Sequence, residues 1–166
     1  MAATLSEPSG DAQAHSARLR GLIQEQIIAA GGAIPFWKFM ELALYAPGLG
    51  YYSAGAHKFG ASGDFITAPE LSPLFAACVA DALTQPLRQA GRDARFVELG
   101  GGSGAFAEAA LEHFQASGVL PARYAILEPS ADLRERQRER LQARLSPALF
   151  ARVEWLDGPI QDPWDG

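Results

Sequence analysis

The sequence has few of the residues that mark secreted, metal-binding or redox proteins. Its single cysteine, Cys78, cannot form a disulfide within the chain, which fits a reducing, intracellular compartment. Because Cys78 lies in the apolar run of residues 74–82, we expect a buried, unreactive thiol rather than a nucleophile. The three histidines and the carboxylates show no metal-ligand spacing, so no structural zinc is expected.

Long hydrophobic runs and an excess of positive charge are also absent. No apolar stretch approaches the roughly 20 residues that a membrane-spanning helix needs. The N-terminus lacks the basic segment and apolar core of a secretory signal. The 14 Lys and Arg stand against 19 Asp and Glu, which gives a net charge of −5. This balance argues against a nucleic-acid partner, because phosphate contacts need clustered cations.

The composition is that of a globular protein: of the 166 residues, 48% are hydrophobic and 20% are charged. We expect a disordered tail over residues 1–15, a helical and glycine-rich segment over 16–90, and a cofactor-binding α/β segment over 91–166. Apolar spacing predicts helices over 16–30, from Pro35 to residue 44, and from Ser72 onward, with Pro86 ending or kinking the last. Residues 48–69 carry five glycines and four aromatic side chains, which favours an ordered covering loop over a flexible insertion.

The stretch R-F-V-E-L-G-G-G-S-G-A-F, residues 95–106, is the centre of the predicted fold. A short apolar strand there ends in glycines, and a helical pattern over 105–115 follows. A strand over 124–127, a helix over 131–145 and a strand over 152–156 continue the alternation, which predicts a doubly wound α/β fold. Three strands make half of such a sheet and leave the first strand with an open edge. We therefore expect an N-terminal piece of a longer protein, with little activity of its own.

Two classes of ligand fit the glycine cluster. Gly100, Gly102 and Ala105 satisfy the loose dinucleotide fingerprint. A carboxylate followed by alternate glycines is also the pattern expected for S-adenosyl-L-methionine. In both cases Glu128, after the second strand, would accept hydrogen bonds from the ribose hydroxyls. The predicted cofactor-binding residues of this region are Glu98, Gly100, Gly101, Gly102, Gly104 and Glu128.

Glu98 favours S-adenosyl-L-methionine over a dinucleotide. A carboxylate at the strand end would repel a pyrophosphate, whereas it would attract the ammonium and sulfonium groups of the methyl donor. The carboxylate of the donor could in turn meet the N-terminus of the following helix. Two alternatives stay open: Glu98 could cap a nearby backbone amide instead, and alternate glycines also occur in ordinary turns.

Two further segments are unusual: I-P-F-W-K-F-M-E-L-A-L-Y-A-P-G-L-G-Y-Y, residues 34–52, and G-D-F-I-T-A-P-E-L-S-P-L-F, residues 63–75. With V-E-L-G-G-G-S-G, residues 97–104, they resemble the MidA-type family of class I S-adenosyl-L-methionine-dependent methyltransferases. That family includes the mitochondrial complex I assembly-factor protein-arginine methyltransferases. The resemblance covers most of residues 20–160, and Ala76 departs from it where glycine is expected.

The resemblance implies a Rossmann-like methyltransferase domain, with its first three strands present here, preceded by a helical segment. It implies S-adenosyl-L-methionine as cofactor and arginine N-methylation of a protein substrate, with a respiratory complex I subunit as the candidate partner. It implies a cytoplasmic location in a bacterium or the mitochondrial matrix in a eukaryote. By the same resemblance, the residues of the second segment near the pocket are Gly63, Asp64, Thr67, Pro69 and Glu70.

Asp64 and Glu70 are the candidate catalytic residues. A protonated arginine guanidinium would need nearby carboxylates to orient it and to hold it until its proton leaves. Asp64 could instead stabilise a turn after Gly63, and Glu70 could lie at the entrance to the helix at Ser72. Two other functions also stay open: a non-catalytic assembly partner that retains the cofactor fold, and an NAD-dependent oxidoreductase.

Overall fold

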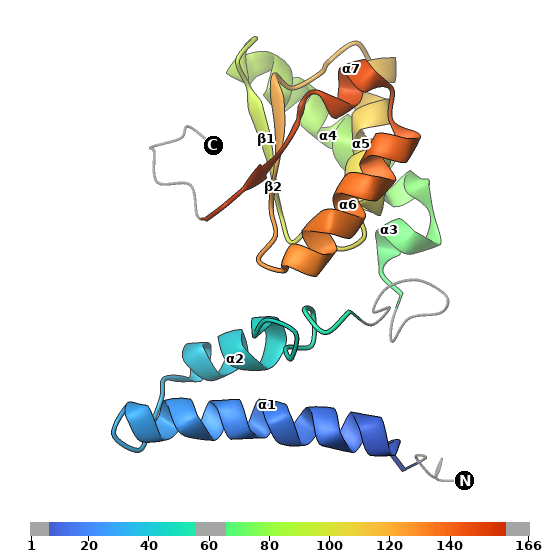
Figure 1. Ribbon diagram of the computed structural model, residues 1–166. Helices are drawn as coiled ribbons and strands as arrows, with labels where there is room; N and C mark the ends of the chain where they lie inside the picture. Colours follow the sequence, from blue (N-terminus) through green and yellow to red (C-terminus); the bar gives the residue numbers. More distant parts are fainter. Residues whose placement is uncertain (1–6, 56–65, 159–166) are drawn as a thin grey trace, which may run out of the picture. The chain divides into compact units, whose positions relative to one another are not determined.

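The computed structural model describes residues 7–55 and 66–158 (Figure 1). The chain divides into two compact units, Met1–Ala56 and His57–Gly166. The described residues contain no helix that is both long and apolar enough to cross a membrane. The predicted three-part division of the chain stays a prediction, and most of the predicted covering loop lies outside the described residues.

The first unit contains two helices, α1 (Gly10–Ala29) and α2 (Phe36–Tyr45). Helix α1 begins before the predicted residue 16 because the hydroxyl of Ser9 caps it, accepting a hydrogen bond from the Ala12 amide at 3.2 Å. His15 therefore lies in a helix, and its Nε2 is 2.8 Å from the carbonyl oxygen of Leu49. This contact ties α1 to the turn that follows α2.

The second unit alternates helices and strands in the predicted order. Its elements are α3 (Ala68–Leu71), α4 (Pro73–Ala90), β1 (Arg95–Leu99), α5 (Ala105–Ala116), β2 (Arg123–Leu127), α6 (Ala131–Arg144), α7 (Pro147–Phe150) and β3 (Val153–Leu156). The helix starts predicted from serines are confirmed: the Ser72 hydroxyl accepts from the Leu74 amide at 3.1 Å, and that of Ser130 accepts from the Leu133 amide at 3.2 Å. The short helices α3 and α7 were not predicted.

The three strands form a parallel sheet in the order β1-β2-β3. Glu98 of β1 is in register with Ile126 of β2, which is in register with Trp155 of β3. Because side chains alternate between the faces of a sheet, these three residues share one face. Figure 1 shows α4, α5 and α6 on the same side of the sheet. Among the described residues, no strand pairs with the other edge of β1.

The core lies between this face of the sheet and the helices. Phe114 of α5 and Tyr124 of β2 are fully buried, and the Phe96 ring packs on both, with ring centroids 5.6 and 4.9 Å away. Helix α6 contributes a stripe at four-residue spacing, in which Leu141 is 0% exposed. An apolar sheet face covered by helices therefore stabilises the Rossmann-like fold of residues 91–156.

Helix α4 differs from two expectations. Pro86 does not end this helix, which continues to Ala90, although proline cannot donate a hydrogen bond to the carbonyl four residues earlier; that Pro86 kinks the helix stays a prediction. Cys78 is exposed rather than buried. The reason is helical geometry: Ala76 and Ala80 both face the core with 0% exposure, and a residue midway between them lies about 200° around the helix, on the opposite side.

Truncation of the core stripe of α6 should destabilise the second unit. We expect Leu141→Ala to lower the free energy of unfolding by about 2–5 kcal/mol, because a fully buried leucine leaves a cavity. Leu141→Met, which conserves volume, should cost less than about 1.5 kcal/mol. Chemical denaturation followed by circular dichroism measures both, and equal losses would contradict tight packing at this position.

Candidate functional site

The glycine cluster connects the end of β1 to the start of α5. The amide of Gly100 donates to the carbonyl of Leu127 at 2.9 Å, which extends the pairing of β1 and β2 into the cluster. Gly104 is the N-cap of α5 in a left-handed conformation, with φ of 82°, where a side chain would be strained. The first amides of α5 therefore open at the carboxyl end of β1, the edge where α/β sheets bind their ligands.

Gly101 lies against the neighbouring strand and helix. A Cβ atom added there would be 2.9 Å from Cγ2 of Ile126 and 3.0 Å from Nε2 of Gln137. At such distances the side chain of Ile126 or Gln137 would have to shift to make room, so a side chain at Gly101 would disturb the packing of α6 on β2. The absence of a side chain at this predicted cofactor-binding position thus has a cause within the chain itself.

Glu98 lies on the helix-covered face of β1. Its Oε2 accepts a hydrogen bond from the Tyr124 hydroxyl at 2.8 Å, a side-chain partner rather than a backbone amide. Burial raises the pKa of Glu98 to about 7; the Tyr124 hydrogen bond lowers it, and the nearby charge of Glu128 raises it further. A carboxyl with this pKa changes charge close to neutral pH.

Glu128 follows β2 and is 4% exposed. Its Oε1 accepts from the Ser130 amide at 3.0 Å, and its Oε2 accepts from Nε2 of Gln137 at 3.4 Å. Burial raises the pKa of Glu128, whereas the hydrogen bonds from Ser130, Gln137 and the Gly102 backbone, together with the charge of Arg134, lower it. These donors favour the ionised form of Glu128 and oppose the effect of burial on its pKa.

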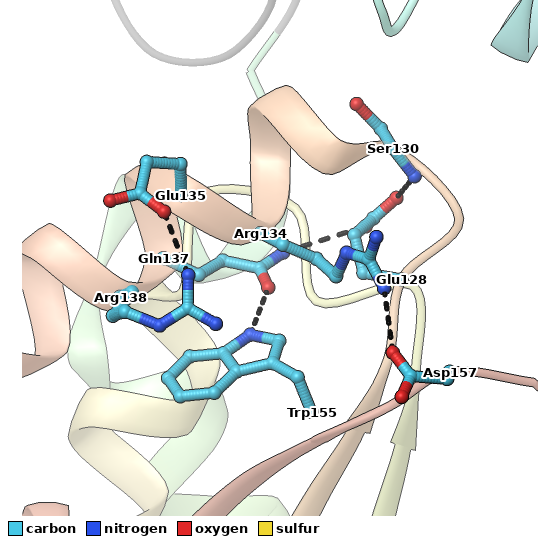
Figure 2. Close-up of polar contacts among 8 residues, drawn as sticks. All are labelled: Glu128, Ser130, Arg134, Glu135, Gln137, Arg138, Trp155 and Asp157. Atoms are coloured by element: carbon cyan, nitrogen blue, oxygen red, sulfur yellow. Dashed lines mark hydrogen bonds and ion pairs between the residues drawn. The ribbon is translucent and has the colours of Figure 1, made fainter.

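Gln137 contacts Glu128 and Trp155 of β3 (Figure 2), and it also contacts the glycine cluster. Its Nε2 also donates to the carbonyl of Gly102 at 2.9 Å. Its Oε1 accepts from Nε1 of Trp155 at 2.9 Å, and Gln137 is 0% exposed. Figure 2 shows the amide of Gln137 between the Trp155 ring and the Glu128 carboxylate.

Glu70 connects α3 to the glycine cluster. The hydroxyl of Ser103 donates to Oε1 of Glu70, and the Ala105 amide donates weakly to the same hydroxyl at 3.4 Å. On the other side, Arg140 of α6 donates to Oε2 of Glu108 at 2.7 Å, and its Nη1 lies 3.5 Å from the Ser103 hydroxyl. A carboxylate from the second unusual segment is thus held at the N-terminus of α5.

The structure brings Glu98, the glycines of residues 100–104, Glu128 and Glu70 to one region of the second unit. Thr67 is the N-cap of α3 and Pro69 lies in its first turn, and no side-chain cap bond forms at Thr67. Gly63 and Asp64 lie outside the described residues. Within the described ranges, no group of three His, Cys, Asp or Glu side chains could hold a metal ion.

The sequence analysis missed four polar side chains of this region: Ser103, Tyr124, Gln137 and Trp155. Gln137 left a detectable signal, since it lies four residues from both Leu133 and Leu141 and so interrupts an apolar stripe. A polar residue at a core position needs partners, and this could have marked it. Ser103 and Tyr124 acquire their roles through contacts with residues 33 and 26 positions away, which no local pattern predicts.

A parallel sheet whose first strand passes through left-handed glycines into a helix, with a carboxylate after the second strand, defines the cofactor-binding half of a Rossmann-like domain. The sequence profile of a family described as "Putative S-adenosyl-L-methionine-dependent methyltransferase" matches residues 78–163, more than half of the 166-residue chain. The chain belongs to this family, whose cofactor is S-adenosyl-L-methionine.

Curated relatives agree with this assignment. The mitochondrial protein arginine methyltransferase NDUFAF7 homolog of Drosophila melanogaster is 35% identical over 108 residues, which cover 64% of this chain and 24% of that protein. The mitochondrial protein arginine methyltransferase NDUFAF7 of Danio rerio is 38% identical over 96 residues, 56% of this chain and 22% of that protein. The chain therefore spans about a quarter of the length of these relatives.

Solved structures extend the likeness to the fold. A protein from Burkholderia thailandensis, crystallised with S-adenosyl-homocysteine, is 48% identical with a TM-score of 0.79, over 93% of this chain and 41% of that one. A native crystal structure from the same organism is 45% identical with a TM-score of 0.76, over 95% of this chain and 39% of that one. The predicted MidA-type family, its cofactor and the partial Rossmann-like fold are thereby confirmed.

The pKa of Glu98 predicts a pH-dependent stability. The pKa lies near 4.5 in the unfolded chain and about 7 in the folded one, so its stabilising contribution is complete below pH 4.5 and is lost as pH rises through 7. Glu98→Gln removes this dependence. The difference in unfolding free energy between the variant and wild type should therefore increase from pH 5 to pH 8, a gain of at most about 3 kcal/mol. Denaturant titrations at four pH values measure this gain; parallel curves for the two proteins would contradict it.

Proposed function

We propose that the protein containing this chain is an S-adenosyl-L-methionine-dependent protein methyltransferase whose cofactor binds at the glycine cluster between β1 and α5. The family assignment supports the reaction class. The observation that carries the location is the convergence of Glu98, the left-handed glycines and Glu128 at the carboxyl ends of two adjacent strands.

In the proposed complex, each part of the cofactor meets a complementary group. The ribose hydroxyls donate to Glu128, which retains acceptor capacity because a carboxylate has about four acceptor positions and three donors from the chain occupy it. The ammonium and sulfonium groups lie nearest Glu98, and the carboxylate of the cofactor meets the first amides of α5. A dinucleotide would instead bring two phosphates toward Glu98, which disfavours the oxidoreductase alternative.

Methyl transfer is a displacement at a carbon that the sulfonium already activates. The cofactor supplies the leaving group, so the protein has to align donor and acceptor and exclude water. In this proposal the glycine cluster and Glu128 hold the adenosine part, and the ionised form of Glu98 attracts the cationic methionine part of the donor to the site.

For the acceptor we infer an arginine side chain of a protein. The names of the relatives from Drosophila melanogaster and Danio rerio support this choice at 35–38% identity. A respiratory complex I subunit as the acceptor stays a prediction from the family resemblance. So do the two predicted locations, bacterial cytoplasm or mitochondrial matrix, although the two relatives are named as mitochondrial proteins.

The cofactor proposal predicts selective binding by the full protein. Isothermal titration should show binding of S-adenosyl-homocysteine and no binding of NADH at the same concentration. Glu128→Ala should weaken the binding about 10–100-fold, because hydrogen bonds to a charged group contribute about 1.5–3 kcal/mol. Glu139→Ala, the same substitution on the exposed face of α6, is the matched control and should bind like wild type.

Turnover separates an enzyme from a non-catalytic partner. The full protein is incubated with radiolabelled S-adenosyl-L-methionine and an extract from cells in which the gene for this protein is deleted. Label should be transferred to protein in the extract, and hydrolysis of that protein should release methylarginine. Binding without transfer would favour the assembly-partner alternative. Binding of NADH in place of S-adenosyl-homocysteine would refute the proposed function.

Asp64 and Glu70 stay candidate catalytic residues, and the Ser103 contact supports a positioning role for Glu70. If Glu70 acts through Ser103, Glu70→Gln and Ser103→Ala should both weaken S-adenosyl-homocysteine binding several-fold and leave methyl transfer at saturating cofactor within about twofold of wild type. If Glu70 instead contacts the acceptor, Glu70→Gln alone should lose turnover with binding intact. Asp64→Asn is measured in the same two assays. Loss of turnover with binding intact would support a catalytic role for Asp64, and unchanged turnover would contradict it.

A further inference from the structure

The amide of Gln137 is the one uncharged polar group in the leucine stripe of α6. Leu133 and Leu141, four residues to either side, are 4% and 0% exposed, and Gln137 is 0% exposed. A buried amide is costly unless its donors and its acceptor are all paired. Here the oxygen and the nitrogen both have partners, on three different segments of the chain. This arrangement suggests a role beyond filling space.

Trp155 determines which way the amide faces. The indole Nε1 can only donate, so the oxygen of Gln137 has to point toward it, at 2.9 Å. In the flipped orientation the amide NH2 would face the indole N–H, and the amide oxygen would face the Glu128 carboxylate. Both contacts would be repulsive, so the Trp155 hydrogen bond fixes the orientation.

With the oxygen fixed, both hydrogens of Nε2 point toward cofactor-site acceptors. One faces the carbonyl of Gly102 in the glycine cluster at 2.9 Å, and the other faces Oε2 of Glu128 at 3.4 Å. A single NH2 group therefore sets the separation between the two segments that are proposed to contact the cofactor. Gly101 allows this approach, because a Cβ atom there would lie 3.0 Å from Nε2 of Gln137.

The Trp155 ring is itself held in place. The guanidinium of Arg138, one residue after Gln137, lies 4.7 Å from the centroid of the ring, and Arg138 pairs with Glu135 at 2.7 Å. Trp155 also packs against the core cluster that contains Ile126, as does Val153 of the same strand. The orientation of the amide thus depends on β3, a strand that makes no proposed contact with the cofactor.

We propose that Gln137, oriented by Trp155, is a positioning residue that aims the Glu128 carboxylate at the vicinal hydroxyls of the cofactor ribose and fixes the Gly102 carbonyl beside it. The inference rests on the proposed function, because it assigns the ribose selectivity of that same site. Gln137 touches no cofactor atom in this arrangement and acts through Glu128.

The effect of Gln137 on the pKa of Glu128 is consistent with this role. The hydrogen bond from Gln137 opposes the effect of burial on the pKa of Glu128, and the Arg134 guanidinium on the same helix acts in the same direction. Glu98 on β1 is a second carboxyl near it, and Asp157 lies 3.5 Å from the Arg134 guanidinium. Loss of the Gln137 donor should therefore raise the pKa of Glu128 and weaken it as an acceptor near neutral pH.

The test measures ribose selectivity in the full protein. Wild type, Gln137→Met and Gln142→Met are titrated with S-adenosyl-homocysteine and with its 2′,3′-dideoxyribose analogue, between pH 6 and 9. Methionine matches the length of glutamine without its donors, and Gln142 is an exposed residue of the same type on the same helix. Gln137→Met should lose about tenfold in affinity for S-adenosyl-homocysteine and little for the analogue, with part of the loss recovered at high pH. Gln142→Met should match wild type.

The outcomes separate this inference from the proposed function. Equal losses for both ligands, or an unchanged ribose preference, would overturn the role of Gln137 and leave the cofactor site standing. No binding of S-adenosyl-homocysteine by wild type would overturn the proposed function, and this inference with it. If Gln137→Met melts below the assay temperature, Trp155→Phe replaces it: loss of the indole donor should reduce the same preference, and an unchanged preference would overturn the inference.

Discussion

The structure of the site depends on one close approach, that of helix α6 to the glycine cluster. The helix can lie there because Gly101 has no Cβ, which would otherwise be 2.9 Å from Ile126 and 3.0 Å from Gln137. This contact places a buried amide between the cluster and Glu128, and it closes the core between α5, α6 and the sheet. Gly101, which lies between two of the alternate glycines, therefore serves the packing of the protein whether or not a ligand is bound.

Local signals were enough to predict the three strands and the helix starts at Ser72 and Ser130. Serine caps at Ser72 and Ser130 and the apolar runs of the strands depend on residues a few positions apart, and the structure confirms them. Position along α4 was harder to predict, because the burial of Cys78 depends on which face of the helix meets the core. An apolar run indicates that a helix has a buried face, but it does not show which residues of the run lie on that face.

The candidate site was predictable only for residues whose type carries chemistry. Glu98 was singled out because glycines follow it, and Glu128 because it follows the second predicted strand. Ser103 and Trp155 gain their roles from partners 33 and 18 positions away, and such pairs become visible only once the chain is folded. Gln137 is intermediate: its place in a leucine stripe marks it as buried, but its three partners belong to the fold.

The two carboxylates are supported so differently that they fit different tasks. Glu128 has an amide and two backbone groups donating to it, which oppose the effect of burial on its pKa and favour a fixed direction of the carboxylate. Glu98 has one described donor, the weakly acidic Tyr124 hydroxyl, and burial holds its pKa at about 7. A positive ligand would stabilise its ionised form and lower that pKa. In the proposed complex, the carboxylate whose pKa a cation would lower therefore lies next to the cationic part of the methyl donor. The carboxylate that three donors from the chain hold in one direction lies next to the neutral ribose hydroxyls.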